Sequence, residues 1–224
     1  MAIAFDAASS ASGNSVSSLT WSHTCTGADL ILIVGVSWFG SARTVSGVTY
    51  AGTALTSVGS ANSGGQKMEI FRLVAPATGA NNVVVTMSSA GETVAGAHSY
   101  TGVDSTTPLG TFASAIGVSG GPTVDVTSAT DEVVVDCASM DNLLTVGAGQ
   151  TQRWNISLGG GLTSGAGSSE PGAATVTMSW SGTPTFAWSI GGVSMKPVGA
   201  GVEAALPGHG PLLADRRNRL IQHV

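Results

Sequence analysis

The chain has 224 residues, of which 32 are Gly, and nearly a quarter are Ser or Thr. Only 9% of the residues are charged, against about 25% in an average soluble domain, and 8 Lys and Arg against 13 Asp and Glu give a formal net charge of -5. This balance argues against nucleic-acid binding as the main task, the many Val and Ile residues argue against disorder, and glycines without a three-residue period exclude collagen.

Strand signals recur along most of the chain. Runs rich in Val, Ile and Thr predict strands at residues 15–22, 30–39, 46–50, 68–74, 82–87, 94–101, 110–117, 123–127, 132–138, 150–157, 174–180 and 186–195. Gly, Ser, Asn and Pro fill the gaps, and no window before residue 200 has a clear helical period. The longest apolar run, residues 30–36, is too short to span a membrane. We therefore expect an all-β, antiparallel, jelly-roll-like β-sandwich with no membrane span.

Parts of the first half of the chain recur in the second half. Residues 84–88, Gly91 and residues 99–103 resemble residues 175–179, Gly182 and residues 189–193, and residues 28–34 loosely match 130–136. The blocks keep their order, so the sequence predicts two related halves at about 1–104 and 109–197, which we expect to share one sandwich. The alternative is that short Val-Thr alternations recur by chance in a β-rich chain.

The composition changes after residue 197. Residues 198–210 are rich in Gly, Ala and Pro, and residues 211–224 then hold three of the eight basic residues beside four large aliphatic ones. We expect residues 198–224 to be a linker and an anchoring arm, extended or briefly helical, that binds another subunit. A solubilising tail is the alternative. The predicted partner-binding residues of the arm are Leu212, Leu213, Arg216, Arg217, Arg219, Leu220 and Ile221.

The first residues lack the basic start and the apolar stretch of a signal peptide, so we expect none. Cys25 and Cys137 are the only cysteines, and we expect buried free thiols in preference to a disulfide.

No motif assembles a catalytic site. Residues 117–122 resemble the segment around the nucleophile of trypsin-like proteases, with Val118 in place of the Asp of that segment, but no matching histidine block precedes Ser119. A hairpin turn explains the segment better. His23, His98, His209 and His223 have no metal-binding spacing. We predict that the protein is not an enzyme and holds no catalytic residue, metal or cofactor.

Four acidic residues cluster at one predicted strand. Glu132 and Asp136 share a face of this strand, whereas Asp131 points away, and Asp141 follows it. A glycosidase pair needs two carboxylates across a cleft, and a calcium loop needs a different spacing. We expect solvated charges that flank the buried residues 133–135.

Aromatic residues suggest a binding function. Tyr100, Trp180 and Trp188 could form a platform on which sugar rings stack, and the two tryptophans flank a short turn. Packing in the core or against a sheet face is the interpretation that we favour for these residues.

Three strings carry a family resemblance. Residues 47–56 (Gly-Val-Thr-Tyr-Ala-Gly-Thr-Ala-Leu-Thr), 72–79 (Arg-Leu-Val-Ala-Pro-Ala-Thr-Gly) and 99–104 (Ser-Tyr-Thr-Gly-Val-Asp) resemble a family of β-rich structural proteins of tailed phages and phage-like elements. The resemblance spans about residues 1–197 and implies a virion component without catalytic residues.

Composition and resemblance together give two functional hypotheses. The first is a non-enzymatic structural virion protein, made in the host cytoplasm and exposed on the particle as a head decoration, fibre-like or tail subunit. Its partners would be identical copies or another capsid or tail protein. The second is a carbohydrate-binding or host-adhesion module that binds a host surface glycan through the aromatic platform.

Overall fold

The structure, a computed structural model, describes residues 1–159 and 163–199. All regular secondary structure in these ranges is β-structure, in fifteen strands. The strands of the first half are β1 (Ala4–Cys25), β2 (Ile31–Phe39), β3 (Val45–Tyr50), β4 (Thr53–Ala54), β5 (Thr56–Ser63), β6 (Gln66–Val74) and β7 (Gly79–Thr101). Those of the second half are β8 (Ala113–Gly117), β9 (Thr123–Thr127), β10 (Val133–Met140), β11 (Thr145–Val146), β12 (Thr151–Ser157), β13 (Ser164–Pro171), β14 (Thr175–Ser181) and β15 (Trp188–Met195). The prediction of an all-β, antiparallel sandwich is confirmed.

Two long strands, β1 and β7, build both layers of the first half. They pair with each other over almost their whole length, and the register of β1 shifts on both sides of Val16, where the strand bends. Residues 83–87 of β7 pair with β3, whereas residues 93–100 pair with β2. The first half is therefore a small sandwich, with an outer sheet β4-β3-β7-β1 and an inner sheet β5-β6-β2-β7-β1.

The second half repeats this arrangement with separate strands. Its inner sheet has the order β12-β13-β10-β15-β8, and its outer sheet has the order β11-β14-β9. Strands β8 and β9 take the places of the two parts of β1, while β14 and β15 take the places of the two parts of β7. The two halves thus have matching strand orders.

One of the three repeated blocks is displaced in the structure. Leu32 pairs with Ser99 in the first half, and Val134, its equivalent, pairs with Ser194 in the second. Ser99 thus corresponds to Ser194 and not to Ser189, which the sequence comparison had matched to it. A shift by five residues reverses the face on which each side chain lies, because side chains alternate along a strand.

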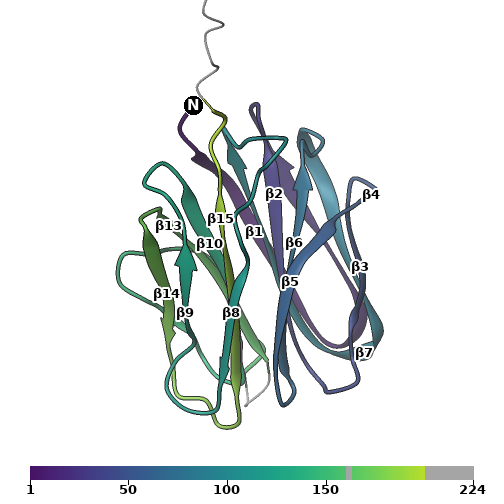
Figure 1. Cartoon of the computed structure of the whole chain (residues 1–224). Helices are drawn as coiled ribbons and strands as arrows, with labels where there is room; N and C mark the ends of the chain where they lie inside the picture. Colours follow the sequence, from purple (N-terminus) through teal and green to yellow (C-terminus); the bar gives the residue numbers. More distant parts are fainter. Residues whose placement is uncertain (160–162, 200–224) are drawn as a thin grey trace, which may run out of the picture.

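The two halves stack to give four layers and three cores (Figure 1). One core lies inside each half, and a third lies between the two inner sheets, where Ile33, Met68 and Ile70 face Cys137 and Val193. No sheet of the described residues mixes strands of both halves, so the halves share a core without sharing a sheet. Cys25 and Cys137 lie buried as free thiols in different cores, as expected.

Small residues let the inner sheets approach each other closely. A Cβ atom on Gly35 would lie 2.7 Å from Cys137 Sγ, and one on Gly96 would lie 2.1 Å from Cδ2 of Trp154. Gly165 of β13 packs in the same way against Ser37. These glycines are required by close approach between the two halves.

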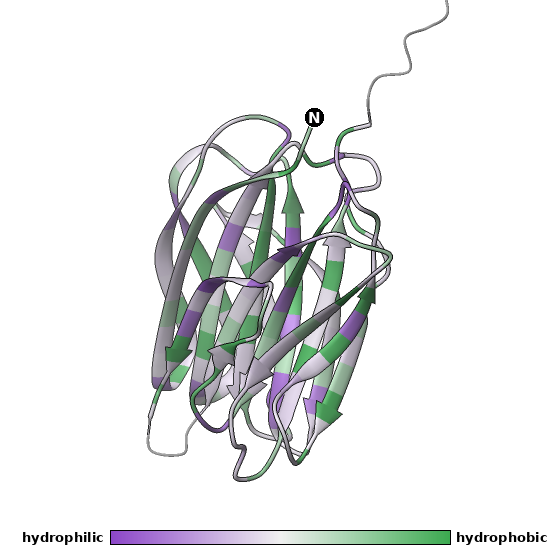
Figure 2. Ribbon diagram, turned by 90° about the vertical axis from the view of Figure 1, so that its left-hand side faces the viewer, coloured by the Kyte–Doolittle hydropathy of each residue, from purple (hydrophilic) through white to green (hydrophobic). Residues whose placement is uncertain are grey.

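The two outermost faces are almost free of charge. On the outer sheet of the second half, the outward positions of β9 and β14 hold Thr or Ser, apart from Asp125, which accepts a hydrogen bond from Thr177. Figure 2 shows this side, with hydrophobic and hydrophilic residues alternating along the strands. On the outer sheet of the first half, the outward residues of β1 are Ser18, Thr20, Ser22 and Thr24.

Candidate functional site

The three aromatic residues pack in the core, as favoured from the sequence, and the alternative of a sugar-binding platform is wrong. Tyr100 is 1% exposed and lies in the core between the halves. Trp180 and Trp188 are 2% and 7% exposed and lie in the core of the second half. A sugar needs an open ring face on which to stack, so these three residues form core structure.

The prediction of a solvated Asp136 is also wrong. Its side chain is 1% exposed, and its carboxylate accepts hydrogen bonds from Trp180 Nε1 at 2.7 Å and from the backbone N of Ser168 at 2.6 Å. Burial raises the pKa of Asp136 to about 6, although these hydrogen bonds lower it. The carboxylate ties β10, β13 and β14 together.

A chain of hydrogen bonds around His23 closes the free edge of the first half. Ser99 Oγ donates its proton to Asp6 at 2.7 Å, so it accepts a bond from His23 Nε2 at 3.1 Å. The other nitrogen of the neutral ring, Nδ1, then accepts from Ser9 Oγ at 2.8 Å, and Ser9 Oγ accepts from Trp21 Nε1 at 3.0 Å. The order resembles a nucleophile, a base and an acid, but His23 is 2% exposed and its links join the two parts of β1 to β7.

This chain predicts loss of stability in mild acid. Burial lowers the pKa of His23 to about 4, despite the attraction of Asp6, whereas the unfolded chain binds the proton near pH 6.5. The stabilisation is complete above pH 6.5 and is lost as the pH falls to 4, by about 3 kcal/mol in total. Urea unfolding from pH 7 to pH 4 should therefore show a smaller loss in His23→Gln than in the wild type. Parallel stability curves for the two proteins would contradict this assignment.

His98 lies between the halves and contacts no solvent. It is 1% exposed, its Nδ1 lies 3.0 Å from the hydroxyl of Tyr100, and its Nε2 has no partner among the described residues. Burial lowers its pKa to about 3, and Arg153 and His23 add to this effect. The neutral ring cannot reach a substrate in solution.

The protease-like segment, residues 117–122, connects β8 to β9. The two strands belong to different sheets, so the segment crosses between layers and is not the hairpin turn that the sequence suggested. Its exposed Ser119 offers its backbone oxygen to Trp188 Nε1 at 2.9 Å. No histidine among the described residues hydrogen-bonds to it.

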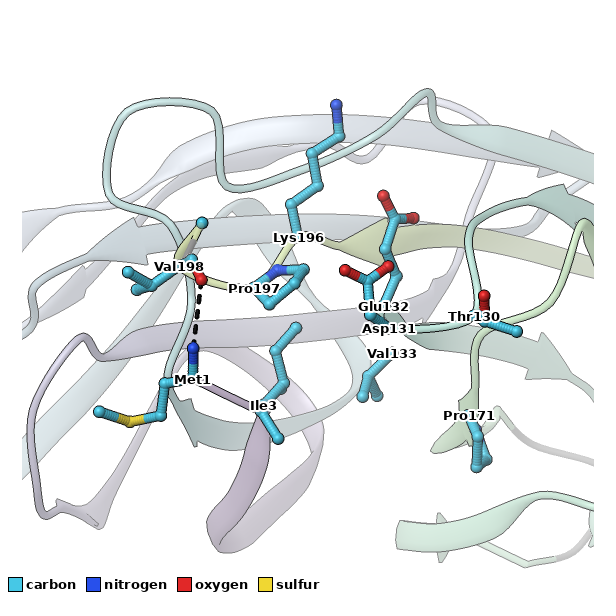
Figure 3. A pocket seen from close by; sticks show the side chains of 12 residues that line it. Met1, Ile3, Thr130, Asp131, Glu132, Val133, Pro171, Lys196, Pro197 and Val198 are labelled. Atoms are coloured by element: carbon cyan, nitrogen blue, oxygen red, sulfur yellow. Dashed lines mark hydrogen bonds between the residues drawn. The ribbon is translucent and has the colours of Figure 1, made fainter. Parts of the chain in front are cut away.

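A cleft of about 770 Å³ lies at the end of the molecule where both halves meet. Residues 1–3 of the first half form one side, residues 130–133 and Pro171 form the other, and residues 196–199 cross between them. Figure 3 shows Met1, Ile3 and Val198 facing Asp131, Glu132 and Val133 across it. We call this hollow the terminal cleft.

Backbone hydrogen bonds fix the walls of the terminal cleft. Met1 N donates to Val198 O at 3.2 Å, and Val198 N donates to Gly102 O at 2.9 Å. Glu132 Oε2 accepts a bond from Ala129 N at 3.2 Å, which orients this carboxylate. The cleft thus combines apolar side chains with the carboxylates of Asp131 and Glu132, and this arrangement suits a segment with aliphatic and basic side chains.

The seven predicted arm residues, Leu212 to Ile221, lie outside the described residues. Of the acidic cluster, Asp131 is exposed and Glu132 half-buried, whereas Asp136 and Asp141 are buried. Sequence reasoning found the acidic pair but missed the cleft, because the partners of the pair come from the first residues of the chain and from residues 196–199.

Comparisons with known proteins give no relative: no family model, no curated protein and no solved structure matches this chain. Within residues 1–159 and 163–199, no group of three or more His, Cys, Asp or Glu side chains could hold a metal ion. The same ranges hold no helix long and apolar enough to cross a membrane.

Proposed function

We propose that the protein is a non-enzymatic structural subunit of a tailed-phage or phage-like particle, displayed on the particle surface as a decoration, fibre-like or tail component. The observation that carries this proposal is the pair of outer sheets, in which the outward residues of β1, β9 and β14 are Ser and Thr apart from Asp125. Such faces pack beside identical copies without like-charge repulsion, and their hydroxyl groups keep them hydrated.

The polar groups that resemble catalytic parts support the same proposal. His23, His98 and Asp136 are buried; the hydrogen bonds of His23 and Asp136 join different strands, whereas His98 bonds to Tyr100 within β7. Burial of these polar groups costs free energy, and the groups serve the rigidity of the fold and not contact with a substrate. The phage-like sequence strings lie at β3 to β5, from the end of β6 to the start of β7, and at the end of β7, all within the first half.

The proposal assigns the anchoring task to residues 198–224. With this arm removed at Pro197, the body should still fold, because its four layers are complete within the described residues, but it should not join particles. The measurement is co-sedimentation of the full-length and shortened proteins with purified particles in a density gradient. Equal incorporation of both proteins would show that the arm is not the anchor.

A further inference from the structure

We propose that the terminal cleft binds residues 211–224 of a second copy of this chain. This inference rests on the proposed structural function and names the partner of the arm and the place where it docks. The exchange would join two subunits through the ends at which their arms leave the sandwich.

The chain leaves the sandwich at the rim of the terminal cleft. The described chain ends at Gly199, which itself lines the terminal cleft, and 25 further residues follow it in the sequence. Residues 200–210 separate the rim of the cleft from residues 211–224 in the sequence. The arm is therefore available at the rim of every cleft, at a high effective concentration once two copies meet end to end.

The side chains of the cleft complement those of the arm. The cleft offers aliphatic surface from Ile3, Val133 and Pro171 beside the carboxylates of Asp131 and Glu132. The arm offers four aliphatic and three guanidinium side chains, at Leu212, Leu213, Arg216, Arg217, Arg219, Leu220 and Ile221. Guanidinium groups bind carboxylates in a fixed, two-pronged geometry, so this pairing has direction as well as charge. Asp215 of the arm has the sign to meet Lys196, the basic side chain at the rim.

The direction of the chain at the rim favours docking on a second copy over docking on the same copy. Val198 is fixed by backbone bonds to Gly102 and Met1, so the direction in which the chain leaves is set at the rim. Exchange between two copies closes as a symmetric pair in which both arms and both clefts are used.

Charge reversal in the full-length protein tests the pairing. The double variant Asp131→Lys, Glu132→Lys and the triple variant Arg216→Glu, Arg217→Glu, Arg219→Glu should each weaken dimerisation at least about tenfold. The combination of all five changes should restore it to within a few-fold. Asp125→Lys, on the outer sheet, is the matched control and should leave the dimer unchanged. Dimerisation is measured by analytical ultracentrifugation and native mass spectrometry.

Crosslinking identifies the donor of the arm. A benzophenone amino acid in place of Leu213 should crosslink to residues 1–3 or 130–133, and a mixture of ¹⁵N-labelled and unlabelled protein should give crosslinks of mixed label. Crosslinks confined to one label would place the arm in its own cleft and overturn the exchange. A monomeric wild type, or reversals without effect on the dimer, would overturn the docking itself. A protein that dimerises in this way but is absent from particles refutes the proposed function alone, and one that is present in particles without this docking refutes the present inference alone.

Discussion

Replacing Trp154 by alanine is expected to lower the free energy of unfolding by about 3–5 kcal/mol. Trp154 of β12 is 4% exposed and belongs to the core between the halves. Its indole ring lies against the backbone of Gly96 and Gly35 on the opposite inner sheet, where any side chain would collide with it. The variant would open a cavity at the interface that joins the two halves, and urea unfolding monitored by circular dichroism measures the loss.

A double-mutant cycle separates this contact from general damage to the fold. Gly96→Ala alone should destabilise the protein, because its Cβ would lie within 2.4 Å of three ring atoms of Trp154. With Trp154→Ala already present, the same change should cost much less. Gly47→Ala is the control, since a Cβ there meets nothing within 4 Å. Additive effects of Gly96→Ala and Trp154→Ala would contradict the close approach of the inner sheets.

Replacing Asp136 by alanine is expected to cost about 2–5 kcal/mol at neutral pH. The change would leave Trp180 Nε1 and the backbone N of Ser168 buried without their acceptor. Asp125→Ala removes a carboxylate from the exposed face of β9 and should change stability by less than about 0.5 kcal/mol.

The pH dependence of the same pair checks the cause. The pKa of Asp136 is raised to about 6 in the folded protein, so the buried charge costs stability above pH 6. The free energy of unfolding of the wild type should therefore rise as the pH falls from about 6 towards 3.8, and Asp136→Ala should lack this rise. Equal stability of the two proteins at pH 7, measured in urea, would contradict the buried hydrogen-bonded carboxylate.

The strands that the sequence predicts are those in which apolar and polar residues alternate or in which β-branched residues run together. Thus β2, β3, β9, β10 and β14 lie close to their predicted bounds. By contrast, β13 has the sequence Ser-Gly-Ala-Gly-Ser-Ser-Glu-Pro, which is typical of a loop. It is a strand because its small residues fit between Ser37 and Trp154, a tertiary demand that local propensity does not contain.

The two long strands show a second limit of sequence patterns. Residues 82–87 and 94–101 were predicted as separate strands, whereas they belong to the single strand β7, which bends from one sheet to the other. The strand signal weakens at the polar residues between them, but the backbone continues its pairing with β1. Pairing with a neighbouring strand depends on residues far away in the sequence, so the alternation of polar and apolar residues along one strand does not reveal it.

The site residues were harder to predict than the fold, for a physical reason. In the sequence, Trp180 and Asp136 can each be taken for a residue of an exposed site. In the structure both are buried, and Trp180 Nε1 donates a hydrogen bond to the Asp136 carboxylate. A polar group is buried only when its partner is in place, and here β14 supplies the partner of β10. The terminal cleft escaped prediction in the same way, because Ile3 and Glu132 lie far apart in the sequence.

Quantitative mass spectrometry of phage or phage-like particles purified from cultures that express this chain tests the proposed structural role most directly. If the protein is a structural surface subunit, its peptides should be found in particles purified through a density gradient. It should be present at many copies per particle and in a fixed ratio to the major capsid or tail protein. Absence of the protein from such particles, or traces that vary between preparations and wash away with salt, would contradict the structural assignment.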